Sequence, residues 1–189
     1  MSQGLSVTGY ALLALFTFDD AELTAYELKR RADNTLRFYW TSPATSQVYT
    51  EASRLTERGL LSSRTSPDGR TSHYRITESG RDLLQSWADG STPGFPVFKH
   101  PYALRLIMGH LSDPSRMSAL LSDYLTELRA ARADLQEVRE SLAGADAPGQ
   151  QLRYPSLVAD WGLAHFDSEY AITTDLLRRL ADDIAADPA

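Results

Sequence analysis

Cysteine is absent from this chain of 189 residues, which excludes disulfide bonds and thiol chemistry within it. Long apolar runs are absent too, since no stretch approaches the roughly 18 residues that a membrane-spanning helix needs. The short apolar stretch YALLALFTF follows a segment without Lys or Arg, which is unlike a secretory signal. These absences predict a cytoplasmic protein that does not cross a membrane.

Motifs for catalysis and metal binding are also lacking. No G-x-S-x-G, P-loop or dinucleotide-binding fingerprint occurs. The histidines are scattered without H-x-x-x-H spacing, so a zinc site is not expected in a chain that lacks cysteine. They are His73, His100, His110 and His165. The sequence therefore predicts a protein that is not an enzyme and that holds no metal or cofactor.

Charge is distributed unevenly along a chain whose net charge is −6. Residues 23–75 carry nine Lys or Arg against five Asp or Glu, a balance of +4. Residues 90–189 carry nine against fourteen, a balance of −5. The difference in sign favours an anionic partner such as nucleic acid for the first half, with ordinary scatter of surface charge as the alternative.

The first half has closely spaced helix signals. Residues 6–16 are predicted to form an apolar helix. A second helix is predicted within residues 19–34, where Thr24 and Glu27 have the spacing of a capping box. A third helix is predicted from Ser42, as N-cap, to Gly59, which suits a left-handed helix end.

A β-hairpin and a further helix are predicted next. The strands cover 60–65 and 72–77, and Pro67 and Gly69 stand in positions of a type I turn between them. A fourth helix is predicted over 78–90. Three helices, a hairpin and one more helix form a winged helix-turn-helix, in which the third helix enters the major groove and the hairpin tip reaches phosphates or the minor groove.

The residues predicted to contact DNA have polar or cationic side chains on the third helix and the wing, which can contact base edges and phosphates. On the helix they lie off the apolar stripe of Val48, Ala52 and Leu55. They are Ser46, Gln47, Tyr49, Thr50, Ser53 and Arg54, with Arg64, Arg70, His73 and Arg75 on the wing. The alternative is a polar face that is only solvated.

The chain resembles the PadR-like family of bacterial transcriptional regulators. The resemblance rests on TAYELKRR in the second helix, SQVYTEASRLTERGLL from the third helix into the wing, GRTSHYRITESGR after it, and HPYALRLIMGHLSDPSRMSALL beyond. It covers roughly residues 5–180 and implies a repressor that binds an operator. Many regulators of this family bind small aromatic or hydrophobic effectors.

The second half is predicted to be a helical dimerisation domain (102–189) that a Pro- and Gly-rich linker (91–101) separates from the DNA-binding domain (1–90). A short helix precedes two long ones with apolar residues at 4-3-4-3 spacing, which predicts an antiparallel pair. The last helix is predicted to begin at Pro155. Apolar flanks beyond the stripes favour a two-fold dimer, which also matches a pseudo-palindromic operator in double-stranded DNA. The dimer contacts are predicted at Leu121, Leu128, Leu135, Ile172, Leu176 and Leu180.

Aromatic residues accumulate in the wing domain, after the linker and on the last helix. Packing between helices is one interpretation. The other follows from the resemblance, which implies an effector cleft lined by aromatic rings. The rings assigned to that cleft are Trp40, Trp87, Tyr102, Trp161, Phe166 and Tyr170. A winged-helix module that contacts proteins and has no affinity for duplex DNA is the alternative to a regulator.

Overall fold

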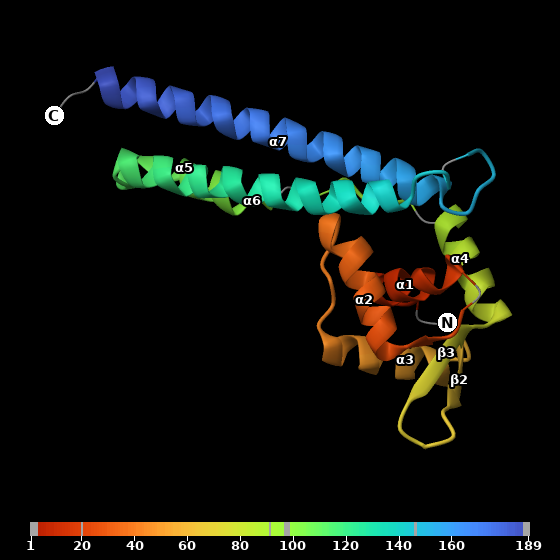
Figure 1. The fold of residues 1–189 in the computed structure, drawn as a ribbon. Coiled ribbons are helices and arrows are strands. Elements are labelled where there is room, and N and C mark those ends of the chain that lie inside the picture. Colours follow the sequence, from red (N-terminus) through yellow and green to blue (C-terminus); the bar gives the residue numbers. More distant parts are fainter. Residues whose placement is uncertain (1–3, 20, 91, 97–98, 146, 187–189) are drawn as a thin grey trace. The chain divides into compact units, whose positions relative to one another are not determined.

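The computed structural model describes residues 4–19, 21–90, 92–96, 99–145 and 147–186. The described chain divides into two compact units, Met1–Gly94 and Phe95–Ala189, and Figure 1 shows the helices and strands of each. The division falls within the predicted linker. Residues 91, 97 and 98 of that linker lie outside the described residues.

The first unit combines helices with a small antiparallel sheet, as expected of a winged helix-turn-helix. The sheet has the order β1-β3-β2, and Tyr74 of β3 lies between Leu23 of β1 and Ser63 of β2. Figure 1 shows the β2–β3 hairpin projecting from this unit. In chain order the elements are α1 (Val7–Ala14), η1 (Leu15–Thr17), β1 (Leu23–Thr24), α2 (Ala25–Thr35), η2 (Leu36–Phe38), α3 (Thr45–Glu57), β2 (Leu61–Thr65), β3 (Ser72–Ile76) and α4 (Glu78–Gly90).

The capping box predicted for α2 is confirmed. The Thr24 N–H donates to Oε2 of Glu27 at 2.8 Å, and the Glu27 N–H donates to the Thr24 hydroxyl at 3.2 Å. The hydrogen bond from the Thr24 amide holds the pKa of Glu27 below its ordinary value. The two side chains thus satisfy amides that the helix geometry leaves without partners.

The start predicted for α3 is wrong. Ser42 is not its N-cap, because the Ser42 hydroxyl donates to Oδ1 of Asp33 on α2 at 2.5 Å. The helix begins at Thr45 with Ala44 as N-cap, and Oε1 of Gln47 accepts the Ala44 N–H at 2.9 Å. The predicted end is confirmed, since Gly59 has a φ of 71°.

The wing turn follows the predicted chemistry. The Gly69 N–H donates to the Ser66 carbonyl at 2.9 Å, and Gly69 has a φ of 71° that favours glycine. The carboxylate of Asp68 accepts the Arg70 N–H at 3.1 Å. This network orders the turn without using the Arg70 side chain.

Apolar residues of the α-helices and the hairpin form one core in the first unit. The stripe predicted for α3 is confirmed, because Val48, Ala52 and Leu55 are fully buried. The largest fully buried side chains of this core are Leu12, Leu13, Phe16, Leu28, Leu55 and Leu61. The core fixes which face of α3 points to solvent.

The second unit is helical. Its elements are α5 (Pro101–Ile107), η3 (Gly109–Leu111), α6 (Pro114–Ser141) and α7 (Arg153–Ala186). Figure 1 shows α6 and α7 side by side. The ion pairs Arg132–Asp167 and Arg139–Asp160 join them in antiparallel order. The last helix begins at Arg153, two residues before the predicted start at Pro155.

The apolar stripe of α6 packs inside this helix pair. Leu121, Leu128 and Leu135 are at most 5% exposed, and α7 buries Ala159 and Thr173. Their own chain already covers these three leucines, and their assignment to a dimer contact stays a prediction. No helix of the described residues is long and apolar enough to span a bilayer.

Candidate nucleic-acid interface

The solvent face of α3 has the polar composition expected of a recognition helix. All six predicted contact residues on this helix are exposed, namely Ser46, Gln47, Tyr49, Thr50, Ser53 and Arg54. The Thr50 hydroxyl donates to the Ser46 carbonyl at 2.9 Å, which leaves it as an acceptor for outside donors. The side-chain oxygen of Gln47 is engaged by Ala44, so its amide nitrogen remains available as a donor.

The wing arginines differ in their surroundings. Nη2 of Arg64 lies 2.7 Å from Oε2 of Glu22, and this hydrogen bond holds the pKa of Glu22 below its ordinary value. Arg70 at the hairpin tip is exposed, and its guanidinium has no ion pair with any described residue. Arg75 is exposed and His73 is half-buried on β3. The charge of Arg70 is therefore more available to an outside anion than the charge of Arg64, which is paired with Glu22.

Two hollows flank the recognition helix. One, of about 330 Å³, opens between the start of α2, α3 and the wing, and Tyr26, Tyr49 and Arg70 line it. The other, of about 310 Å³, lies between the start of α1 and α3. Tyr26 is 68% exposed and was not predicted from the sequence. Its place off the buried stripe of α2 (Ala25, Leu28, Ala32) was the available signal.

The hollow beside α1 has a different electrostatic character, because the Glu51 carboxylate lines it. The Glu51 side chain is 13% exposed, and its Oε1 is buried without a hydrogen-bond partner among the described residues. The nearest cation is Arg54, whose Nη1 lies 3.8 Å from Oε2. Sequence reasoning placed Arg54 on the DNA face but missed Glu51 beside it.

The aromatic residues assigned to an effector cleft are dispersed within each unit. In the first unit Trp87 stacks on Tyr10 with ring centroids 4.6 Å apart, whereas Trp40 is 58% exposed. In the second unit Trp161 stacks on His165. Phe166 and Tyr170 line a hollow of about 270 Å³ between α6 and α7, and Tyr102 stacks on Tyr124 at 4.0 Å. Of the assigned residues, Phe166 and Tyr170 line this one hollow together.

A hydrogen-bonded cluster in the second unit was also missed by sequence reasoning. Nε2 of His100 lies 2.9 Å from Oε1 of Glu169 and 3.0 Å from the Tyr124 hydroxyl. Burial, followed by the charge of Glu169, raises the pKa of Tyr124. These residues come from the start of α5, from α6 and from α7, and no local spacing signals their contact. No group of three or more His, Asp or Glu among the described residues could hold a metal ion.

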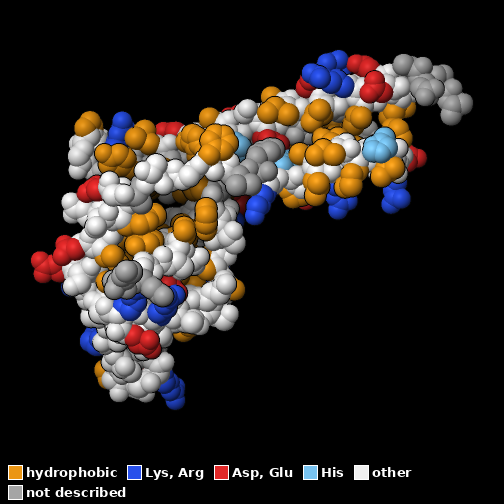
Figure 2. Space-filling view, turned by 180° about the vertical axis from the view of Figure 1, so that it is seen from behind, with side chains coloured by type: hydrophobic (Ala, Val, Ile, Leu, Met, Phe, Trp, Pro, Cys, Tyr) orange, Lys and Arg blue, Asp and Glu red, His pale blue; other side chains and the backbone are white. Residues whose placement is uncertain are grey.

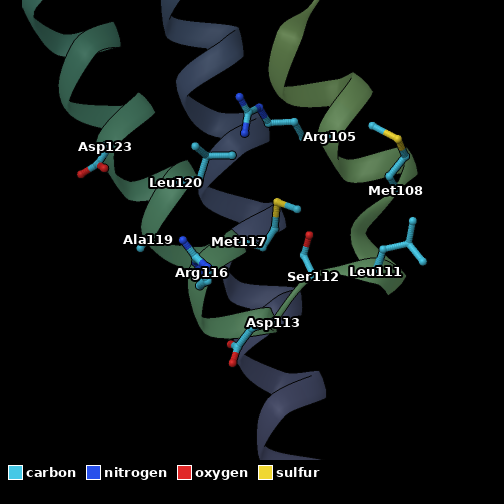
Figure 3. Close-up of a pocket in the computed structure, with 10 residues that line it drawn as sticks. All are labelled: Arg105, Met108, Leu111, Ser112, Asp113, Arg116, Met117, Ala119, Leu120 and Asp123. Atoms are coloured by element: carbon cyan, nitrogen blue, oxygen red, sulfur yellow. The ribbon is translucent and has the colours of Figure 1, made fainter.

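A hollow of about 650 Å³ lies between α5, η3 and the start of α6. Figure 3 shows Arg105 from α5 and Met117 and Leu120 from α6 projecting into the space between these helices. None of the six aromatic residues assigned to the effector lines it. Its lining is mixed, with apolar side chains next to Arg116, Asp113 and Asp123.

Apolar side chains remain exposed on the second unit, and Figure 2 shows hydrophobic side chains gathered along it. Leu104, Ile107 and Leu111 on α5 and η3 are between 60% and 75% exposed. Ile172 on α7 is 53% exposed, and Leu176 and Leu180 are half-buried. These last three residues therefore lie on the surface, unlike the leucines of the α6 stripe.

The comparisons with known proteins agree with this architecture. No protein-family model matches the chain. The chain is 28% identical over 147 residues to the negative transcriptional regulator PadR of Bacillus subtilis, covering 76% of this chain and 79% of that protein. It also superimposes on the crystal structure of Bacillus subtilis PadR in complex with operator DNA, with a TM-score of 0.77 and 25% identity, covering 93% of this chain and 99% of that one.

Two further solved structures show the same fold. A PadR-like transcriptional regulator from Bacillus cereus matches with a TM-score of 0.76 and 16% identity over 95% of this chain and 99% of that one. Bacillus subtilis PadR in complex with p-coumaric acid matches with a TM-score of 0.74 and 24% identity, covering 93% and 99%. The shared fold spans both units of the chain.

Proposed function

The chain belongs to the PadR-like family of transcriptional regulators, and from that premise we propose that it is a repressor that binds operator DNA and releases it when a small molecule binds. The observation that carries this proposal is the exposed polar face of α3 next to Arg70 of the wing, whose guanidinium has no ion pair with any described residue. The α3 helix enters the major groove and the wing contacts the DNA backbone. The protein acts on cytoplasmic DNA and is not an enzyme.

The proposed repressor is a homodimer. Its second unit exposes several large apolar side chains, which is typical of a surface that contacts another protein. They are Ile172 on α7 and Leu104, Ile107 and Leu111 on α5 and η3. A second copy related by a two-fold axis covers such a surface without leaving an open end. Two recognition helices about 34 Å apart then match a pseudo-palindromic operator.

The proposed effector is a small aromatic or hydrophobic molecule. Support comes from the relative, since Bacillus subtilis PadR has been crystallised with p-coumaric acid. Within the second unit Phe166 and Tyr170 line one hollow, which Tyr102 and Trp161 do not line. Effectors shift affinity through about 1–3 kcal/mol of coupling, so a modest change in the separation of the two recognition helices is sufficient.

Selection of duplexes from a random pool by the purified protein tests DNA binding. We expect enrichment of a two-fold symmetric sequence, and an affinity that falls steeply with salt because each phosphate contact releases condensed counterions. Absence of enrichment, together with no binding near micromolar concentration at low salt, contradicts the proposal and favours a module that contacts proteins. Arg70→Ala, with Arg178→Ala on α7 as the matched control, tests whether the wing takes part.

A further inference from the structure

The hollow between α2, α3 and the wing collects hydrogen-bond donors from three elements. Tyr26 belongs to the first turn of α2, Tyr49 to α3, and Arg70 and Thr71 to the wing. Its volume is about 330 Å³. No acidic residue is among the described residues that line it.

The side-chain donors of Tyr26, Tyr49 and Arg70 are not engaged by any described residue. Tyr26 and Tyr49 are 68% and 51% exposed, and neither phenol has a hydrogen-bond partner among the described residues. The Arg70 guanidinium also has no partner among the described residues, whereas Arg64 on the same hairpin is paired with Glu22. Two phenols and a guanidinium therefore face an open space without a carboxylate.

The helix that carries Tyr26 contributes a partial positive charge at its N-terminus, which the Glu27 carboxylate of the capping box offsets. The Thr24–Glu27 capping box engages the amides of those two residues. The amides of the first turn have no acceptor within the helix, and the aligned peptide dipoles give this end a partial positive charge. Tyr26 is the second residue of α2, so its phenol lies at that end.

The opposite flank of α3 has the reverse character. There the hollow is lined by Glu51, whose Oε1 is buried without a hydrogen-bond partner among the described residues. A phosphate placed on that side would meet the Glu51 carboxylate, whose neighbouring cation is Arg54 at 3.8 Å from Oε2. The two flanks therefore distinguish the side of α3 that faces the sugar-phosphate backbone from the side that does not.

We infer that Tyr26, Tyr49 and Arg70 together hold one backbone phosphate of duplex DNA. This inference rests on the proposed DNA binding and adds a site to it. The phosphate seat joins the start of α2 to the wing tip across α3 and fixes the angle at which the recognition helix enters the groove. Tyr49 then positions the protein, and the reading of bases falls to Ser46, Gln47, Thr50, Ser53 and Arg54.

The test uses the full-length protein and the duplex enriched from the random pool. Single phosphates are replaced by neutral methylphosphonates, one at a time, and affinity is measured for the wild type and for Tyr26→Phe, Tyr49→Phe and Arg70→Ala. The two Phe variants remove only a hydroxyl from an exposed ring. Tyr154→Phe is the matched control, because Tyr154 is 76% exposed on α7.

We expect that neutralising one particular phosphate in each half-site lowers the affinity of the wild type about 10-fold. A loss of this size is typical when hydrogen bonds to a charged group are removed. Each of the three variants should bind the unmodified duplex more weakly than the wild type does. Neutralising that same phosphate should then cause no further loss of affinity, so the effects of the substitution and of the methylphosphonate are not additive. Arg70→Ala also reduces the salt slope by about 1. The Tyr154→Phe control keeps the wild-type pattern.

If the three variants lose their sensitivity to neutralisation at different phosphates, or keep it at every phosphate, the three residues do not share one phosphate, while the proposed DNA binding stands. A wild-type protein that enriches no duplex and binds none overturns the seat and the proposed function together. The two failures are therefore distinguishable.

Discussion

The phenol oxygen of Tyr124 lies 3.0 Å from Nε2 of His100, and this contact joins the start of α5 to α6. Nδ1 of the same imidazole accepts the Ala103 N–H at 3.1 Å, so the ring proton is assigned to Nε2. The same Nε2 also lies 2.9 Å from Oε1 of Glu169 on α7. One histidine thereby caps a short helix and connects it to both long helices.

This arrangement predicts a loss of stability at alkaline pH. Burial raises the pKa of Tyr124 above its ordinary value of 10.0. As pH rises above about 10, the unfolded chain releases the phenol proton before the folded chain does, so folding becomes less favourable. The contribution of Tyr124 is fully present below that pH and is lost above it.

Urea unfolding at several pH values measures this effect. Tyr124→Phe removes the hydroxyl and is expected to cost about 1 kcal/mol near neutral pH. The gap between wild type and variant should narrow above pH 10, whereas Tyr154→Phe on α7 should behave like the wild type throughout. A gap that stays constant across the alkaline range would count against a Tyr124 that resists ionisation.

The sequence predicted features that are local along the chain. The capping box of Thr24 and Glu27 and the end of α3 at Gly59 each depend on neighbours within a few residues, and the structure has both. Ser42 was assigned wrongly because Asp33, on the preceding helix, takes its hydroxyl. Where a side chain can reach two partners, the sequence spacing does not show which of them it binds.

Contacts between distant segments were not predictable in the same way. The 4-3-4-3 stripe of α6 shows that Leu128 must be covered, but spacing does not say whether α7 of the same chain or a second copy covers it. Likewise His100 and Glu169 meet only because α5 packs against the helix pair. Composition located the aromatic residues without showing whether they enclose a space.

A second prediction concerns Gly9 on α1 and Glu51 on α3. A methyl group at Gly9 would lie 2.3 Å from Oε1 of Glu51, which is buried. Gly9→Ala should therefore destabilise the wild type, although alanine ordinarily favours a helix over glycine. In a Glu51→Ala background the cost should fall by about 1 kcal/mol or more, because the clashing oxygen is gone.

A double-mutant cycle by urea unfolding provides the measurement. Additive effects of the two substitutions would show that Glu51 does not pack on the first turn of α1. Thr8→Ala serves as the control, since it changes the neighbouring position in the same turn without placing an atom where Gly9 lacks one.

A third prediction concerns the ion pair between Glu22 and Arg64, whose side-chain atoms lie 2.7 Å apart. Glu22→Gln removes a negative charge and releases the guanidinium for a phosphate contact. Operator affinity should rise several-fold, and the salt slope should steepen by up to about 0.9, the contribution of one phosphate contact. Titrations of DNA over a salt series measure both quantities.

The double variant Glu22→Gln with Arg64→Ala separates a specific effect from a general one. If Arg64 makes the new contact, the second substitution abolishes the gain in slope. A gain that persists without Arg64 would mean that Glu22 only adds to the overall repulsion of DNA.

The last prediction concerns assembly. Ile172 is 53% exposed on α7, so Ile172→Asp should leave the chain folded while placing a carboxylate in the proposed dimer contact, where its burial costs several kcal/mol. Light scattering should give twice the chain mass of 21.0 kDa for the wild type and a single chain mass for the variant. Leu128→Asp is the contrasting variant, because Leu128 is only 5% exposed within the helix pair and its replacement should unfold the second unit instead.

Operator affinity of the Ile172→Asp monomer should fall by orders of magnitude, since its two half-site contacts are no longer linked. A wild-type mass of one chain would exclude the dimer, and a dimeric Ile172→Asp variant would place the contact elsewhere, with the exposed Leu104 and Ile107 of α5 as the next positions to replace.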